Sequence, residues 1–250
     1  MRLKKWVKIA LFSFSMLSIV ALAEKRRSSK VCQRILIDVD NRHENYFVNE
    51  KDVQMLVTNA GADNVIGKRY LELDLKALEH RIEANKYVRR AEVYRDVKGN
   101  LLVYVEQNRP LARLLRQDAP DAYISDAGEV LPVSDAYTAR VMLISGPYTE
   151  RLIKHNITED GKNQQVFALI DYISRDEFWK SQIAGIDIDE NGDITMYPQI
   201  GKQRIEFGRA ENISDKFDKL SVFYDQILPR KGWNFYNRVN LKYQDQIVCD

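Results

Sequence analysis

The sequence predicts an α+β protein with two folded domains behind a single N-terminal apolar segment. Ile9 to Ala23 is a run of 15 uncharged residues with basic residues on both sides. Stretches that alternate like strands are interspersed with amphipathic helical stretches over residues 32–250. Asn108-Arg109-Pro110 interrupts this pattern and separates a predicted domain at 32–108 from one at 109–250.

The apolar segment has two interpretations, and the sequence leaves both open. Residues 9–23, extended to 6–24 by Trp6 and Val7, approach the roughly 20 residues that a transmembrane helix needs. Residues 1–8 would then be a cytoplasmic tail and 24–31 a polar linker. Alternatively, Ala21-Leu22-Ala23 matches the cleavage site of a signal peptide. Basic residues flank the segment on both sides, so the positive-inside rule does not decide orientation. Both interpretations place the remaining chain outside the cytoplasm.

The first domain is predicted to follow the order strand, helix, helix, strand, strand. Its predicted elements are a strand through Ile35, Ile37 and Val39; a helix from Glu50 to Ala60, capped by Asn49 and stopped by Gly61; a helix from Asp74 to Asn85; a strand through Ala91 and Val93; and, after a turn at Lys98-Gly99-Asn100, a strand through Leu101, Val103 and Val105.

The second domain is predicted to be rich in strands with flanking helices. Its predicted strands lie at 122–132 (two strands around Asp126-Ala127-Gly128), 140–145, 183–188, 193–197 and 203–207. One predicted helix carries Val166, Leu169, Ile170 and Ile173. A second is capped by Ser214, carries Phe217, Leu220, Tyr224 and Ile227, and ends at Pro229 and Gly232.

A final strand is predicted near the C-terminus, because Val239, Leu241, Tyr243 and Ile247 alternate with polar residues. An edge position would leave its backbone groups available to another chain, whereas an interior position would not. The aromatic residues just before it, Trp233, Phe235 and Tyr236, are expected to pack in the core, with an interface role as the alternative.

Composition and motifs exclude several classes of function. A net charge of +2 provides no field for nucleic acid. His43, His80 and His155 lie far apart, and no serine elbow or phosphate-binding loop is found. We therefore expect no catalytic site, no cofactor, no metal site and no small-molecule substrate. Cys32 and Cys249 are expected to be reduced thiols.

One motif invites a metal-site interpretation. Asp187-x-Asp189-x-Asn191-Gly192-Asp193 matches the first positions of a calcium loop. The position of the bidentate glutamate is Pro198, however, and no flanking helices are predicted. A hairpin with an Asn-Gly turn is therefore expected, with a weak adventitious calcium site as the alternative.

Three segments of the first domain, Leu75 to Asn85, residues 87–93 (YVRRAEV) and residues 101–110 (LLVYVEQNRP), resemble the POTRA domain of the FtsQ/DivIB family of bacterial division proteins. Three later segments resemble motifs of its β-domain: Tyr123 to Gly128, Ile205 to Gly208 and Val239 to Tyr243. Lys86 and Lys242 depart from the family, which often has proline and arginine there.

The resemblance implies a non-enzymatic scaffold with one transmembrane helix in the inner membrane, a cytoplasmic N-terminus and periplasmic domains at the division septum. Its implied partners are the coiled-coil proteins FtsB and FtsL and other components of the division machinery. FtsB would pair with the terminal strand, so the implied partner-binding residues are Val239, Asn240, Leu241, Lys242 and Tyr243, and Tyr243 is the best single candidate. The recruited complex would regulate septal peptidoglycan synthesis.

Two alternatives remain. The first is a POTRA protein of outer-membrane assembly or secretion, although the residues after Pro110 lack the repeated amphipathic spans of a barrel. The second is a secreted enzyme released by cleavage after Ala23, although no catalytic constellation is found.

Overall fold

The computed structural model describes residues 12–18, 31–155, 157 and 160–250, and these residues form two compact units divided between Gln107 and Asn108. Residues 12–18 are helical, and the side chains of Phe12, Phe14, Met16 and Leu17 are exposed. The rest of the predicted transmembrane segment lies outside the described residues. None of the helices within the described ranges is long and apolar enough to cross a membrane.

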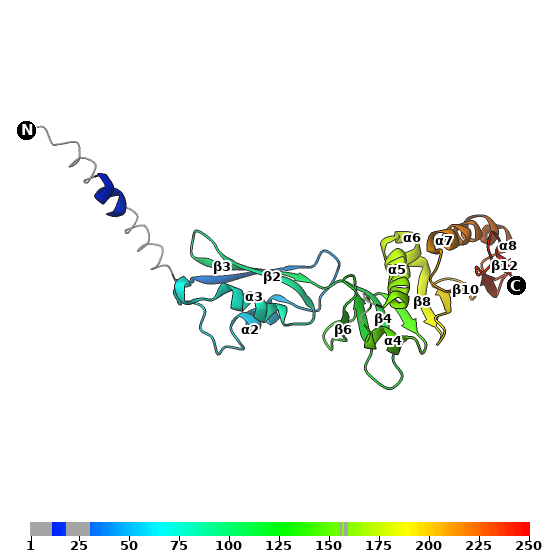
Figure 1. Cartoon of the computed structure of the whole chain (residues 1–250), viewed down its shortest axis with the longest axis horizontal. Helices are drawn as coiled ribbons and strands as arrows, with labels where there is room; N and C mark the ends of the chain where they lie inside the picture. The colour runs from blue at the N-terminus through cyan, green and yellow to red at the C-terminus, as the bar shows by residue number, and fades with distance from the viewer. Residues whose placement is uncertain (1–11, 19–30, 156, 158–159) are drawn as a thin grey trace, which may run out of the picture. The chain divides into compact units, whose positions relative to one another are not determined.

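The described part of the N-terminal unit is a three-stranded sheet with helices on one face (Figure 1). Its elements are β1 (Arg34–Asp40), α2 (Glu50–Val57), η1 (Tyr70–Glu72), α3 (Leu75–Glu83), β2 (Val88–Arg95) and β3 (Asn100–Gln107). β3 lies in the centre, parallel to β1 and antiparallel to β2. Along β3 every second residue is buried, so Leu101, Val103 and Val105 face the core. The predicted order of elements is confirmed.

The helix starts of this unit are those that the sequence predicts. The side chain of Asn49 accepts hydrogen bonds from the backbone N–H groups of Lys51 and Asp52, and the Asp52 carboxylate accepts one from the Asn49 backbone N–H. The predicted end of this helix at Ala60 was wrong, since α2 stops at Val57. Asn59 and Ala60 already have positive φ values of 48° and 53°, which an α-helix does not tolerate.

Nine strands of the described C-terminal unit form one mixed sheet, in the order β12-β11-β10-β9-β8-β7-β4-β5-β6. The strands are β4 (Pro110–Leu114), β5 (Ala122–Ser125), β6 (Val130–Pro132), β7 (Met142–Ser145), β8 (Ile183–Ile188), β9 (Ile194–Pro198), β10 (Arg204–Gly208), β11 (Arg238–Asn240) and β12 (Val248–Cys249). β8 and β9 form the predicted hairpin at Asn191-Gly192, so this prediction is confirmed.

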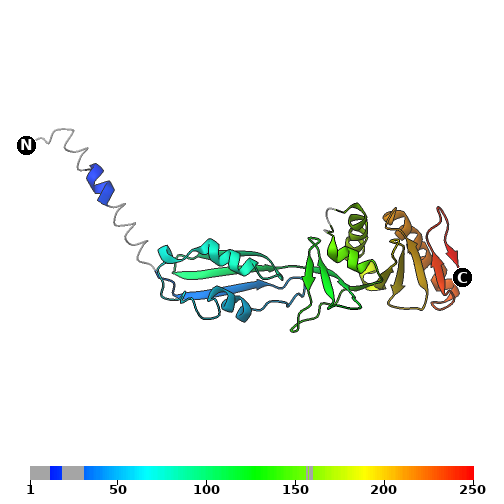
Figure 2. The same ribbon diagram turned by 60° about the horizontal axis from the view of Figure 1, so that its bottom comes forward.

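The helices of this unit are α4 (Thr149–Lys154), α5 (Gly161–Arg175), α6 (Glu177–Gln182), α7 (Ile213–Val222), the π-helical turn η2 (Phe223–Ile227) and α8 (Leu228–Lys231). The two longest, α5 and α7, lie on the same side of the strands (Figure 2). Between them and the sheet lies one apolar core that includes Ile170, Ile186, Phe207, Phe217 and Leu220.

The helix after β10 differs from its prediction at both ends. Ser214 is not the cap: the helix begins at Ile213, after Asn212 in a left-handed conformation with φ 49°. Pro229 does not end the helical segment, since it lies inside α8. The missing N–H of this proline interrupts ordinary α-helical bonding in the turn before it, and that turn is the π-helical η2. Gly232, with φ 98°, follows the last helical residue.

Candidate partner-binding edge of the C-terminal sheet

β11 is an interior strand, which settles the question of its edge position. It runs parallel to β10, with Val239 opposite Ile205, and antiparallel to β12, with Val239 opposite Cys249. The predicted continuous strand through Ile247 was wrong. The chain leaves the sheet after Leu241 and reverses through Asp245, which has a φ of 56°, so that β12 comes back along β11.

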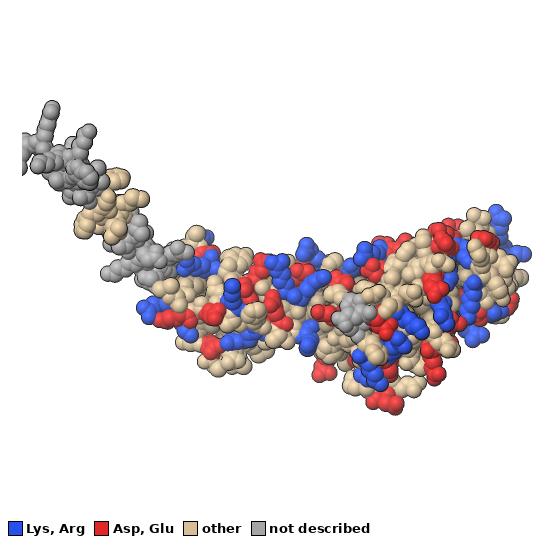
Figure 3. All heavy atoms as spheres, in the orientation of Figure 1, with Lys and Arg blue, Asp and Glu red and all other residues tan. Residues whose placement is uncertain are grey.

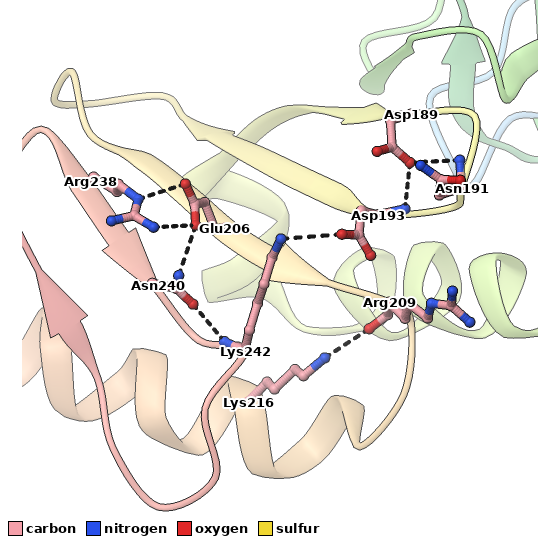
Figure 4. A network of polar contacts seen from close by, with 9 residues as sticks. All are labelled: Asp189, Asn191, Asp193, Glu206, Arg209, Lys216, Arg238, Asn240 and Lys242. Atoms are coloured by element: carbon pink, nitrogen blue, oxygen red, sulfur yellow. Dashed lines mark hydrogen bonds and ion pairs between the residues drawn. The ribbon is translucent and has the colours of Figure 1, made fainter.

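A carboxylate on β10 holds β11 in place (Figure 4). Glu206 accepts two hydrogen bonds from the guanidinium of Arg238, at 2.6 and 2.9 Å, and a third from the side-chain amide of Asn240 at 2.8 Å. The bonds from Arg238 lower the pKa of Glu206, and the carboxylate raises that of Arg238. Arg238 also reaches the Asp250 carboxylate at 2.7 Å and thereby ties β12 to the same centre.

Lysines fix the chain just after β11. The backbone N–H of Lys242 bonds to the Asn240 side-chain oxygen at 2.9 Å, and its ammonium lies 3.2 Å from the Asp193 carboxylate (Figure 4). Lys219 of α7 donates to the carbonyls of Leu241, at 3.1 Å, and Tyr243, at 2.7 Å. The loop between β11 and β12 is therefore attached to both the β8–β9 turn and α7.

A third lysine strengthens the same side of the sheet. The ammonium of Lys216 donates to the Arg209 carbonyl at 2.8 Å and lies 4.6 Å from the centre of the Phe207 ring. Burial lowers the pKa of Lys216. The start of α7 is thus fastened to the end of β10.

The five predicted partner-binding residues are adjacent in space but differ in accessibility. Val239 and Leu241 are fully buried in the core, and Asn240 is buried with both polar atoms bonded. Lys242 and Tyr243 face solvent, and Tyr243 is 51% exposed. A partner can therefore touch the side chains of the last two, while the first three shape the sheet beneath them.

Among the described residues, β12 forms the edge of the sheet next to β11. Asp250 and Arg238 exchange backbone hydrogen bonds at 3.1 and 3.2 Å, so they form a hydrogen-bonded antiparallel pair. In an antiparallel ladder such pairs alternate with pairs whose backbone groups point away from each other. The N–H and C=O of Cys249 therefore point away from β11. The sequence did not predict this short strand, because two residues carry no periodic pattern.

Aromatic residues lie on the helices and loop before β11. All three were predicted to pack in the core. Tyr236 does pack against it, whereas Trp233 and Phe235 are 42% and 60% exposed. The buried ring of Tyr224 packs against both Trp233 and Phe178, with ring centres 6.0 and 5.8 Å away. Burial raises the pKa of Tyr224 to about 12. The packing prediction therefore holds for Tyr236, and the other two rings add apolar surface.

The calcium-like motif is a hairpin turn with its carboxylates engaged. Asp189 accepts hydrogen bonds from the backbone of Asn191 at 2.8 Å and Asp193 at 2.9 Å. Asp187 accepts one from the Ser145 hydroxyl at 2.7 Å. These oxygens do not converge on one point, and within the part of the chain that is described no group of three or more histidine, cysteine or acidic residues is arranged to hold a metal ion.

Comparisons with known proteins bear on both units. A family model described as "FtsQ/DivIB, C-terminal related" matches residues 109–250, more than half of the chain. The chain belongs to this FtsQ/DivIB family. A POTRA-like domain model matches residues 30–106, so the α+β fold with a POTRA-like domain and a β-rich domain is confirmed.

Two curated relatives carry the name "Cell division protein FtsQ". The protein from Syntrophotalea carbinolica is 25% identical over 177 residues, and the one from Geotalea daltonii is 24% identical over 179 residues. Each match covers 70% of this chain, but 62% and 63% of the respective relative. The chain therefore aligns with somewhat less than two thirds of the length of these FtsQ proteins.

Proposed function

We propose that this FtsQ/DivIB-family chain is a membrane-anchored scaffold of the bacterial cell-division machinery. The names of its two relatives support the division role, and the apolar segment at 9–23 supports the anchor. In this proposal residues 1–8 lie in the cytoplasm, and the POTRA-like and β-rich domains act in the periplasm at the septum. The protein recruits FtsB and FtsL and so regulates septal peptidoglycan synthesis, without chemistry of its own.

The partner strand is proposed to add to the sheet at β12. This proposal rests chiefly on the outward backbone groups of Cys249, since a strand edge supplies hydrogen bonds that an incoming extended segment completes. Tyr243 lies in the adjoining loop, where its half-exposed ring offers an anchor of the kind that contributes most to interfaces. Val239, Asn240 and Leu241 contribute indirectly, because they hold β11 in the sheet next to β12. Lys242 contributes by holding the loop that carries Tyr243.

Binding of the full-length chain in detergent to the FtsB–FtsL pair of the same organism tests this proposal. Cys249→Pro removes the outward N–H, whereas Cys249→Ala keeps it and serves as the matched control. Tyr243→Ala removes the exposed ring, and Tyr197→Ala, a half-exposed tyrosine on β9, is its control. Proline at Leu241 is unsuitable because that N–H bonds to the Glu206 carbonyl at 3.0 Å and holds the sheet together.

We expect wild type and both controls to bind, and Cys249→Pro and Tyr243→Ala to bind at least about tenfold more weakly. Circular dichroism and thermal unfolding must show that all variants are folded. Absence of binding by folded wild type would remove the proposed partners. Undiminished binding by Cys249→Pro would instead overturn strand addition at β12 and leave the partners in place.

A further inference from the structure

One end of the N-terminal unit presents exposed aliphatic side chains on three separate segments. They are Val31 at 39% exposure, Ile66 at 51%, Leu71 at 75% and Val97 at 88%. Since isolated surface leucines and valines are common, their shared location matters more than their exposure.

Backbone contacts bring these segments together at the end where β1 begins (Figure 1). Val31 pairs with Arg69 in an isolated bridge, and Gly67 donates to the Cys32 carbonyl at 2.8 Å. The β2–β3 turn joins them, because Gln33 donates to the Gly99 carbonyl at 2.8 Å. The three segments that carry the four aliphatic residues therefore lie at one end of the unit, which we call the aliphatic end.

Basic residues accompany the aliphatic ones on the same segments. Lys68 and Arg69 follow Ile66 after one glycine, and Arg95 and Lys98 lie two residues before and one residue after Val97. Acidic and basic side chains are interspersed on the face of the unit that Figure 3 shows. On these segments Arg69 pairs with Glu72, and Asp96 accepts hydrogen bonds from the backbone and side chain of Asn100, both at 2.7 Å. Four basic residues (Lys68, Arg69, Arg95 and Lys98) against two acids (Glu72 and Asp96) leave the aliphatic end with a net charge of +2.

The aliphatic end is also close to the apolar segment along the chain. Only residues 24–30 separate Ala23 from Val31, and seven residues reach at most about 25 Å when fully extended. Four of these seven residues are basic: Lys25, Arg26, Arg27 and Lys30. An anchor at 9–23 would thus keep the aliphatic end within a short distance of the lipid headgroups.

We propose that the aliphatic end rests on the surface of the anionic bilayer in which the chain is anchored; this inference depends on the proposed anchor. Leu71 and Val97 enter the headgroup region, while Lys68 and Lys98 extend toward anionic lipid. Aliphatic tips beside lysine and arginine suit such an interface, where apolar burial and attraction to anionic lipid act together. Four aliphatic tips on three segments make a surface that a fluid layer of lipid can fit.

Fluorescence quenching in nanodiscs tests this contact with the full-length chain. In a Cys249→Ser background the remaining native cysteine is Cys32, which is fully buried and therefore protected from the dye. Val97→Cys places an environment-sensitive dye at the aliphatic end. Tyr46→Cys places the same dye at a residue 55% exposed beyond the far end of β1, roughly 20 Å away. The nanodiscs contain anionic lipid and lipids brominated near the headgroup.

We expect the dye at Val97 to be quenched about twofold or more and the dye at Tyr46 to be unaffected. Replacing both Lys68 and Lys98 by glutamate should reduce the quenching at Val97. A chain that elutes apart from the nanodiscs would overturn the anchor, and this inference with it. Incorporated chain with equal signals at both positions would overturn the lipid contact alone and leave the anchor in place.

Discussion

Two buried tyrosine hydroxyls allow a matched test at the residue scale. The hydroxyl of Tyr148 donates to the Asn163 side-chain oxygen at 3.2 Å, whereas that of Tyr224 has no hydrogen-bond partner among the described residues. A buried polar group without a partner destabilises the fold, and one with a partner contributes modestly. We expect Tyr224→Phe to raise the free energy of unfolding by up to about 1 kcal/mol and Tyr148→Phe to lower it by about 1 kcal/mol. Urea denaturation measures both, and equal losses would contradict the assignment.

A second residue-scale prediction concerns the carboxylate that holds β11. Glu206→Gln removes the charge that binds Arg238, and we expect it to lower the free energy of unfolding by about 1 kcal/mol, a figure reduced because the two side chains are 27% and 37% exposed. Glu190→Gln, at an exposed glutamate of the β8–β9 turn, should change stability by less than about 0.5 kcal/mol and serves as the control.

The pH dependence of the same pair has a definite sign. The pKa of Glu206 is lower in the folded chain than in the unfolded one, where it is about 4.3. Its stabilising effect is therefore complete above that value and declines as the pH falls through the folded pKa. The stability difference between wild type and Glu206→Gln should consequently shrink in acid. A difference that stays constant from neutral pH to about pH 3 would exclude ionisation of Glu206 as its cause.

At the scale of elements, the sequence predicted helix starts better than helix ends or short strands. Asn49 and Asp74 could be recognised as caps because their side-chain oxygens accept hydrogen bonds from backbone N–H groups only two or three residues further along the chain. The end of α2, the π-helical turn before Pro229 and the two-residue β12 depend on backbone conformations that leave no periodic pattern. β4, α4 and α6 were missed for a related reason: each has six residues or fewer, so the patterns of strand and helix are hard to tell apart.

The cap of α2 gives a prediction at this scale. Asn49→Ala removes the acceptor for two backbone N–H groups, and we expect a loss of about 1 kcal/mol in the free energy of unfolding. Asn49→Asp retains an oxygen acceptor and should behave like wild type. Thermal unfolding of the three proteins compares them directly, and a normal midpoint for the alanine variant would show that the cap contributes little.

The same contrast holds at the candidate site. Alternation of side chains located the C-terminal residues of interest, yet it implied one continuous strand. The actual course of the chain depends on the bonds from Lys219 to the loop and on the left-handed turn at Asp245. The first join residues far apart in the sequence, and the second is an unusual backbone conformation, so neither leaves a periodic pattern. Tyr243 is therefore exposed on a loop, while Val239 and Leu241 are in the core.

For the molecule as a whole, the two units have separate cores, and this separation can be measured. Phe217 is buried in the C-terminal unit and contacts Trp179 and Phe207, with ring centres 4.9 and 5.5 Å away. Phe217→Ala should lower the stability of that unit by about 3–5 kcal/mol. Hydrogen exchange should accelerate within residues 108–250 and stay unchanged within 31–107. Acceleration of comparable size in both units would show that they unfold together.

The shortness of β12 has a consequence for choice of partner. A long, flat strand edge invites pairing with any extended chain and is a hazard for aggregation. Of the two residues of β12 only Cys249 points its backbone groups outward, so hydrogen bonding by itself holds a passing segment only weakly. In the proposed strand addition, an arriving chain would also have to fit the side chains nearby to remain attached. Such an edge would stay uncovered in a crowded compartment and still be occupied when a matching sequence arrives.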